Sequence, residues 1–293
     1  MSLFDNRGKM WFGTEERMGW IETPQTGADV SPVRHGAQAT LLNGRGFSRD
    51  SWASHKEYQF SWGDSADLRL ASKISAYASG SYGRGLIYFH DPMYYGTNLL
   101  ARHHADPSMA LNYEAPSLID GIDPRSTPTG NNTNDLPLNR AIYDVPAGYS
   151  AQSAGDEIFI PIPDGHTAFL GAVYTSTTGA DLYFRTPGGT FALTKVGPNA
   201  SNIAPDAITG QPWVRIGMRN TSGASVAISI AAMTLRISDT VAPVANFTDG
   251  PWLTGEGSTG CRFVGMPTRI NYNGVMGGQV GVSATLKEVD AWG

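Results

Sequence analysis

Residues 226–237 read VAISIAAMTLRI, and this stretch decides the fold. Val226, Ile228 and Ile230 alternate with small residues, so the branched side chains fall on one face of an extended chain. Apolar and polar side chains alternate again in residues 233–237. A period of two sustained over this length predicts a long β-strand.

Strand-like runs continue on the N-terminal side of this stretch, back to Arg140. Including residues 226–237 there are six runs between Arg140 and Ile237: residues 156–162, 167–174, 181–186, 191–196, 213–220 and 226–237. Turn signals such as Pro163-Asp164-Gly165 and Pro187-Gly188-Gly189 separate them and supply the φ angles of tight reversals. No helical pattern intervenes. The spacing favours an antiparallel β-sandwich of jelly-roll type.

Composition agrees with a mainly β chain. The 293 residues include 35 Gly and 18 Pro, which suits many turns, and the length favours two domains. The net charge of -5 argues against a surface built to hold phosphates. A single cysteine, Cys261, excludes an internal disulfide and a thiolate zinc cluster. The polar start and the lack of a long apolar run predict synthesis and folding in a cytoplasm, with no membrane span.

Before the sandwich, the chain predicts strand, helix and strand in succession. Residues 55–62 alternate aromatic and polar side chains, with Tyr58, Phe60 and Trp62 on one face. A second short strand is expected at residues 86–89, which are apolar and end at an Asp-Pro pair. The two strands and the helix between them would form one compact unit.

The helix is marked by its apolar spacing. Leu70, Ile74 and Tyr77 fall at i, i+4 and i+7, which places them on one helical face. We expect Asp64 or Ser65 to cap its N-terminus. Gly80 stands where a C-terminal glycine is expected.

The remaining segments set the expected domain limits. Residues 1–114 form the first part of an N-terminal β-rich domain with one helix, residues 115–139 a linker, and residues 140–238 an inserted β-sandwich. Residues 239–293 should return to the first domain. They end in a turn at Asn273-Gly274 and a long strand from Gln279, and a hairpin of that size cannot bury a core alone.

The sequence indicates no catalytic, metal or cofactor site. It lacks a Gly-x-Ser-x-Gly elbow and a phosphate-binding loop. The densest polar cluster has two interpretations, as ligands for zinc or manganese or as turn and strand-end residues. The second is favoured, because two of its aspartates precede prolines. The cluster consists of His90, Asp91, His103, His104 and Asp106.

Aromatic residues offer candidate surfaces. In the sandwich, Tyr174, Tyr183 and Trp213 are candidates for a sugar-stacking platform, although a Trp that opens a strand is more often a core residue. Five other Trp exceed what one small core needs, and we take them as candidates for a subunit interface. These are Trp11, Trp20, Trp52, Trp62 and Trp292.

Two stretches resemble minor tail proteins of long-tailed phages of actinobacteria. One is LIYFHDP at residues 86–92 with TNLL at 97–100 and Ala105-Asp106-Pro107, where the family often has a Trp in place of His104. The other contains GCRF at 260–263, GMPT at 265–268 and ATLKEVDAW at 284–292. With the sandwich between them, the resemblance covers most of the chain.

The resemblance implies a distal tail protein, a non-enzymatic virion protein made in the host cytoplasm and located at the tail tip. Its first domain would form a ring, a hexamer, that continues the tail tube and lets DNA pass as cargo. Its other expected partners are the tail tube protein, the tape measure protein, the tail hub and other minor tail proteins, with no membrane. The sandwich, of carbohydrate-binding-module type, would project outward.

The alternative is a tip protein that binds or cleaves a host surface glycan. Cleavage requires two positioned carboxylates. Asp156, Glu157 and Asp181 are candidates, but their spacing pairs none of them.

Overall fold

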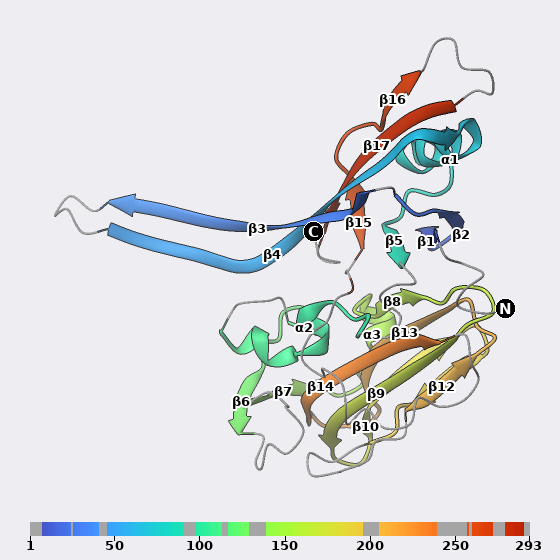
Figure 1. The fold of residues 1–293 in the computed structure, drawn as a ribbon. Coiled ribbons are helices and arrows are strands. Elements are labelled where there is room, and N and C mark those ends of the chain that lie inside the picture. The colour runs from blue at the N-terminus through green and yellow to red at the C-terminus, as the bar shows by residue number, and fades with distance from the viewer. Residues whose placement is uncertain are drawn as a thin grey trace.

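Strands dominate the computed structural model. It describes residues 8–24, 26–40, 46–90, 98–112, 117–128, 139–195, 205–238, 257, 260–271 and 279–289. Within these ranges the strands form three antiparallel sheets, so the expected mainly β class is confirmed (Figure 1). None of the helices described is long and apolar enough to cross a membrane.

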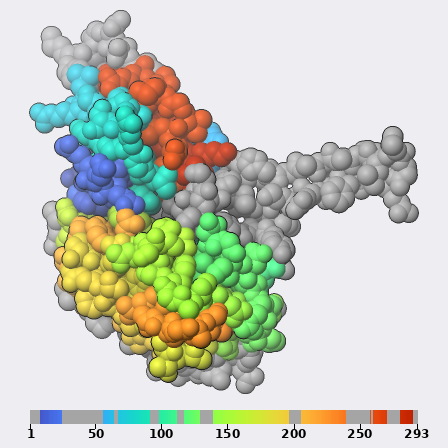
Figure 2. Space-filling view, turned by 180° about the vertical axis from the view of Figure 1, so that it is seen from behind, coloured from blue at the N-terminus to red at the C-terminus, as the bar shows by residue number. Residues whose placement is uncertain are grey.

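The first sheet combines strands from both ends of the chain. Its order is β2-β1-β5-β15-β17-β4-β3, and β16 also pairs with β17. The strands are β1 (Lys9–Thr14), β2 (Arg17–Glu22), β3 (Thr26–Thr40), β4 (Gly46–Asp67), β5 (Ile87–His90), β15 (Cys261–Phe263), β16 (Thr268–Asn271) and β17 (Gln279–Glu288). In Figure 2 the blue, cyan and red segments accordingly form one body beside the green to orange sandwich.

The C-terminal strand β17 belongs to the first sheet, as the sequence predicted, and it lies between β15 and β4. Its Leu286 is opposite Tyr58 and its Ala284 opposite Phe60. Val282 and Leu286 are buried with the aromatic side chains of β4, so the apolar face of β17 is covered by the first sheet's own core.

Helix α1 (Leu68–Ala78) packs on the first sheet through Leu70, Ile74 and Tyr77, as predicted. Its N-cap is Asp67, whose side chain accepts a hydrogen bond from Arg69 N at 3.0 Å, and the expected cap at Asp64 or Ser65 is wrong. The reason is that β4 stays extended as far as Asp67, where it pairs with Gln279 of β17.

The helix ends in a Schellman motif. Gly80 has a φ of 76°, and its amide donates to Tyr77 O at 3.0 Å while Ser81 N donates to Ala76 O at 2.9 Å. A side chain would be strained at that φ, so the predicted C-terminal glycine is confirmed.

Strands β3 and β4 form a hairpin that projects from the rest of the molecule (Figure 1). The pairing of β17 with β4 stops at Glu57. Beyond that residue, and within the described ranges, β4 pairs with β3 alone, and β3 is the last strand of the sheet. At about 3.3 Å per residue, residues 46–55 of β4 extend about 33 Å beyond the contacts of Lys56 with Glu288 and Gly257.

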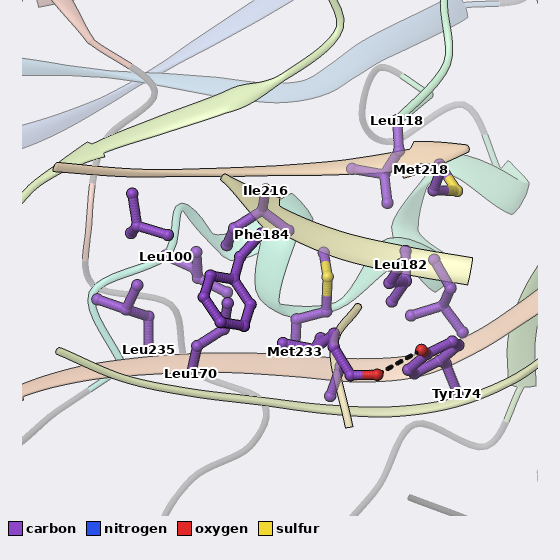
Figure 3. Packing of buried hydrophobic residues seen from close by; sticks show 14 of the residues in the cluster. Leu100, Leu118, Leu170, Tyr174, Leu182, Phe184, Ile216, Met218, Met233 and Leu235 are labelled. Carbon is purple, nitrogen blue, oxygen red and sulfur yellow. Dashed lines mark hydrogen bonds between the residues drawn. The ribbon is translucent and has the colours of Figure 1, made fainter. Parts of the chain in front are cut away.

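The sandwich consists of a four-stranded sheet, β11-β10-β13-β8, facing a five-stranded sheet, β12-β9-β14-β7-β6. Its strands are β6 (Arg125–Pro128), β7 (Asn139–Val145), β8 (Ile158–Pro161), β9 (Thr167–Ser176), β10 (Ala180–Thr186), β11 (Gly189–Ala192), β12 (Asp206–Thr209), β13 (Trp213–Asn220) and β14 (Val226–Ser238). A short helix, α3 (Ala151–Ala154), follows β7. Figure 3 shows Leu170 and Met233 of one sheet packing against Leu182 and Ile216 of the other.

The decisive strand β14 carries a β-bulge. Its pairing with β9 shifts between Ile230 and Ala232. Before the bulge the core residues are Ile228 and Ile230, and after it they are odd-numbered, from Met233 to Ile237. The extra residue keeps both halves of the apolar pattern facing inward.

Residues 98–112 and 117–128 belong to the sandwich, which differs from the expected limit at 114 and the expected linker at 115–139. They contain α2 (Arg102–Ala105), a 3-10 helix (Pro107–Asn112) and β6, which pairs with β7. Leu100 and Ile119 are each 1% exposed within the sandwich core. Asn98 fixes the start, because its side chain donates to Met233 O at 3.0 Å and accepts from Leu235 N at 3.1 Å.

Candidate functional site: the joint between the first sheet and the sandwich

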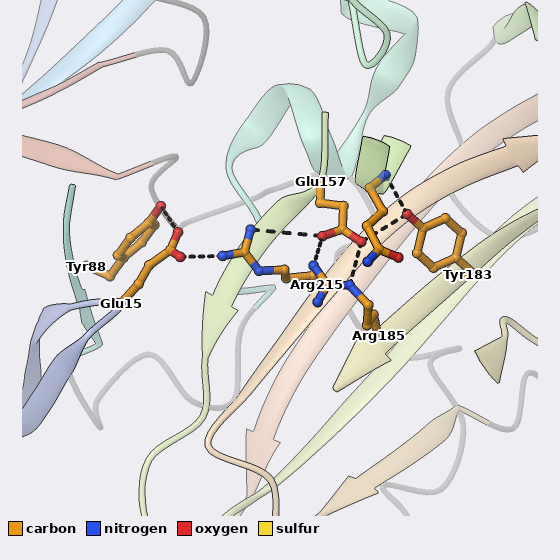
Figure 4. A network of polar contacts seen from close by, with 7 residues as sticks. Glu15, Tyr88, Glu157, Tyr183, Arg185 and Arg215 are labelled. Atoms are coloured by element: carbon orange, nitrogen blue, oxygen red, sulfur yellow. Dashed lines mark hydrogen bonds and ion pairs between the residues drawn. The ribbon is translucent and has the colours of Figure 1, made fainter. Parts of the chain in front are cut away.

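A chain of alternating charges joins the first sheet to the sandwich (Figure 4). Glu15, in the turn between β1 and β2, forms an ion pair with Arg215 of β13. The Arg215 guanidinium also lies 3.9 Å from Glu157, which forms a second ion pair with Arg185 of β10. We call this group, together with the contacts of Tyr88 and His90 described below, the joint.

Arg215 reaches the joint because buried and outward-facing residues alternate along β13. Val214, Ile216 and Met218 are buried between the two sheets, so the odd-numbered residues of the strand face outward. Trp213 lies on this outer face next to Arg215, and the Arg185 and Arg215 guanidiniums are 5.5 and 5.7 Å from its ring. The two arginines therefore stack on an aromatic residue and pair with acids at the same time.

Glu157 is the most buried charge of the joint, with 3% of its side chain exposed. Its Oε1 accepts hydrogen bonds from Tyr183 Oη and Arg185 Nε, both at 2.9 Å. Burial, together with the hydrogen bond to Glu157, raises the pKa of Tyr183 to about 12, so its hydroxyl stays protonated and donates. Tyr183 approaches β13 over Gly217, where an added Cβ would lie 2.8 Å from the hydroxyl oxygen.

Neutral contacts complete the joint. Tyr88 of β5 donates to Glu15 at 3.4 Å, and its ring is 4.7 Å from the ring of Phe159 in β8. His90 Nε2 lies 3.1 Å from Pro161 O, which can only accept, so this nitrogen carries the proton. Burial lowers the pKa of His90 to about 4, which keeps the imidazole neutral and the contact unchanged near neutral pH.

The predicted sugar platform in the sandwich is wrong. Tyr174 and Tyr183 are each 1% exposed and belong to different sheets. Their hydroxyls are engaged, with Tyr174 donating to Leu193 O at 2.7 Å and Tyr183 to Glu157. Trp213 is half-buried between two arginines, so the three rings form no common surface.

The Trp residues predicted to form a subunit interface do not share one surface among the described residues. Trp11 and Trp62 are 5% and 2% exposed within the first sheet, so their assignment to an interface is wrong. Trp20 is half-buried, 5.1 Å from the Trp11 ring and 5.9 Å from the His166 ring of the sandwich. The side chain of Trp52 and all of Trp292 lie outside the described residues.

The polar cluster around His90 is divided between two places. His90 belongs to the joint, whereas His103 and His104 lie on α2 with their rings 4.2 Å apart. Asp106 accepts from Ser108 N at 3.1 Å at the start of the 3-10 helix, the turn chemistry that the sequence favoured. Asp91 lies outside the described residues, and those that are described contain no group of three or more potential metal ligands.

The carboxylates considered for glycan cleavage also have separate partners. Asp156 accepts a hydrogen bond from Tyr149, Asp181 forms an ion pair with Arg219 at 2.7 Å, and Glu157 belongs to the joint. Each is engaged with its own donor, and none of these contacts joins one carboxylate to another.

Sequence reasoning did not single out Glu15 or Arg215 as partners. The sequence did hold one signal: in β13 the apolar residues alternate with Arg215, so the arginine must point away from the core and is available for a contact. Its partner is 200 residues away in sequence, so no local pattern identifies Glu15.

Comparison with known proteins found no matching family model, no matching curated protein and no matching solved structure. The joint and the projecting hairpin are thus the features from which a function has to be inferred.

Replacing Glu157 with Gln should destabilise the protein. The amide keeps the shape but leaves Arg185 without its counter-charge, at a cost of about 2 to 4 kcal/mol for a mostly buried pair. Denaturant unfolding of the full chain measures the change. The matched control is Glu16→Gln, because Glu16 is exposed in the same turn as Glu15 and forms no ion pair among the described residues. An equal effect of both variants would show that the buried pair contributes nothing specific.

Proposed function

We propose that this chain is a structural protein of a phage tail tip, a distal tail protein that assembles into a ring between the tail tube and the tip. The observation that carries the proposal is the projecting β3–β4 hairpin. An isolated two-stranded hairpin is marginal in water, and strands with an unpaired edge tend to pair with another chain. A hairpin that projects by about 33 Å therefore suits an arm that lies on a neighbouring copy.

The first sheet and the joint support the same proposal. A ring requires each subunit to present the same two surfaces at a fixed angle. The first sheet, in which β17 joins β15 to β4, is a rigid base for the arm. The joint fixes the sandwich to that base through an ion pair, a ring contact and a hydrogen bond. The sandwich would then be carried at the periphery of the ring, and the passage for DNA would lie inside it.

The test is the mass of the purified protein in solution. Six chains of 31.3 kDa give a hexamer of about 188 kDa, measurable by native mass spectrometry and visible as rings by electron microscopy. Replacing residues 34–54 with a short Gly-Ser turn removes the projecting part of the hairpin and should yield monomers. Glu16→Gln, which keeps the arm, is the control and should assemble normally. A wild-type protein that stays monomeric at about 0.1 mM would refute the proposal.

A further inference from the structure

The first sheet and the sandwich have separate cores. Their buried apolar residues fall into two clusters that share no member. Tyr88 and Phe159, which meet at the joint, are 6% and 8% exposed but belong to neither cluster. Two parts of a chain are expected to move relative to one another unless the interface between them is large and apolar. The joint consists of a few ring and polar contacts, so it is the place where this molecule can change shape.

Arg215 is held from the sandwich side whether or not Glu15 is near. Its guanidinium lies 3.9 Å from Glu157 and 5.0 Å from the ring of Phe159, both of which belong to the sandwich. The side chains of Glu15 and Arg215 are 37% and 24% exposed, so water reaches both when they part. Separation therefore leaves neither charge buried without a partner, and the ion pair can break at low cost.

Trp11 carries a polar group that the closed joint leaves unpaired. Met10 and Phe12 point into the core of the first sheet, so Trp11 lies on the opposite face of β1. His90, directly opposite it on β5, contacts Pro161 of the sandwich, so this face is turned toward the joint. Trp11 is 5% exposed, and its Nε1 has no hydrogen-bond partner among the described residues. A buried donor without a partner destabilises the closed state, and opening lets water reach it.

A second contact between the two parts lies at Gly257. Its amide donates to Leu100 O at 3.1 Å, and its carbonyl accepts from Lys56 Nζ of β4 at 3.3 Å. The approach is too close for a side chain, since an added Cβ would lie 1.7 Å from Leu99 O. Leu100 lies just before α2, which Figure 1 shows to the left of β5, whereas β1 and β2 lie to its right. This contact is thus a pivot on the side of the molecule away from Glu15.

We propose that the joint is a salt-sensitive latch, and that the sandwich turns away from the first sheet about Gly257 when Glu15 releases Arg215. The closed joint is the resting state, because its ring contact and its neutral hydrogen bond oppose opening. Salt screens the partly exposed ion pair and shifts the balance toward the open state. The proposal does not depend on ring assembly, because all of these residues come from one chain.

Two native side chains report opening and unfolding separately. His90 is 8% exposed against the sandwich, so diethyl pyrocarbonate can acylate it readily only when the joint opens. Cys261 is the only cysteine and is 0% exposed in the core of the first sheet, so a thiol reagent reaches it only when that sheet unfolds. Peptide mass spectrometry of the full chain measures both rates.

Salt and one charge variant test the latch. In the wild type the rate of His90 modification should rise about two- to fivefold between about 0.05 and 1 M NaCl, as expected for an exposed ion pair, while the Cys261 rate stays unchanged. Glu15→Gln should raise the His90 rate by about the same factor at low salt and remove its dependence on salt, because no ion pair is left to screen. Glu16→Gln is the matched control, an exposed acid of the same turn, and should behave as the wild type does.

Three results would overturn the proposal. One is a His90 rate that does not change with salt in the wild type. Another is a salt dependence that persists in Glu15→Gln. The third is a Cys261 rate that rises together with the His90 rate, which would mean that the first sheet unfolds as a whole.

Discussion

A chain that ends at Asn273 should lose its first sheet while its sandwich still folds. The deletion removes β17, which pairs with β4, β15 and β16. Val280, Val282 and Leu286 are each at most 3% exposed, and each contributes about 1.5 to 3 kcal/mol when fully buried. Their loss approaches the total stability of a typical domain, about 5 to 15 kcal/mol.

Calorimetry separates the two outcomes for this shortened chain. One unfolding transition with a β-type circular dichroism spectrum should remain, and ring assembly should be lost with the first sheet. A milder variant, Leu286→Ala, should cost about 2 to 5 kcal/mol in the full chain. Ser283→Ala, on the exposed face of the same strand, should change little. If the shortened chain still assembled into rings, β17 would be peripheral to the first sheet.

A fragment of residues 98–238 should fold by itself, whereas a fragment of residues 140–238 should not. Besides Ala105, the shorter fragment lacks four large apolar side chains of the sandwich core, Leu99, Leu100, Leu118 and Ile119. At about 1.5 to 3 kcal/mol each, their absence removes roughly 6 to 12 kcal/mol. It also exposes the edge of β7 that β6 covers.

Chemical denaturation of the two fragments distinguishes these cases. The longer fragment should unfold in one cooperative transition, and the shorter one should show no sharp transition or should aggregate. Ile119→Ala in the longer fragment should cost about 2 to 5 kcal/mol, because Ile119 is 1% exposed and its truncation leaves a cavity in the core. Asp120→Ala, at the exposed neighbouring position, is the control. Cooperative folding of residues 140–238 would place the limit of the sandwich where the sequence alone predicted it.

The regular elements were predictable from local patterns. Strand β14 follows from its period of two, α1 from its apolar spacing, and the pairing of β17 with the first sheet from an apolar face that a small hairpin cannot cover. The buried positions of β14 change from even to odd numbers after Ile230. This change indicates a bulge, because an extra residue is needed to keep both halves facing inward.

Most of the elements that escaped prediction have short or polar sequences, although the seven-residue strand β7 was missed as well. Strand β12 and strand β6 are four residues each, and both are edge strands of the five-stranded sheet. The described residues between 98 and 128 look irregular because their apolar residues are few, yet Leu100, Leu118 and Ile119 are buried by strands distant in sequence. The candidate site could not be predicted for the same reason. Arg215 and its partner Glu15 are far apart in sequence and meet only when the turn at Glu15 folds against the sandwich.

Because β17 is the last strand in sequence and an internal strand of the first sheet, the sandwich can fold before the first sheet during synthesis. On the ribosome, β5 is complete about 190 residues before β17 begins, which corresponds to about 10 to 40 s at typical elongation rates. The whole sandwich emerges in this interval and is able to fold first. Until then the N-terminal strands lack β17, so a nascent chain has no complete first sheet. If the protein assembles through its first sheet, as proposed, that assembly should begin only after β17 has emerged.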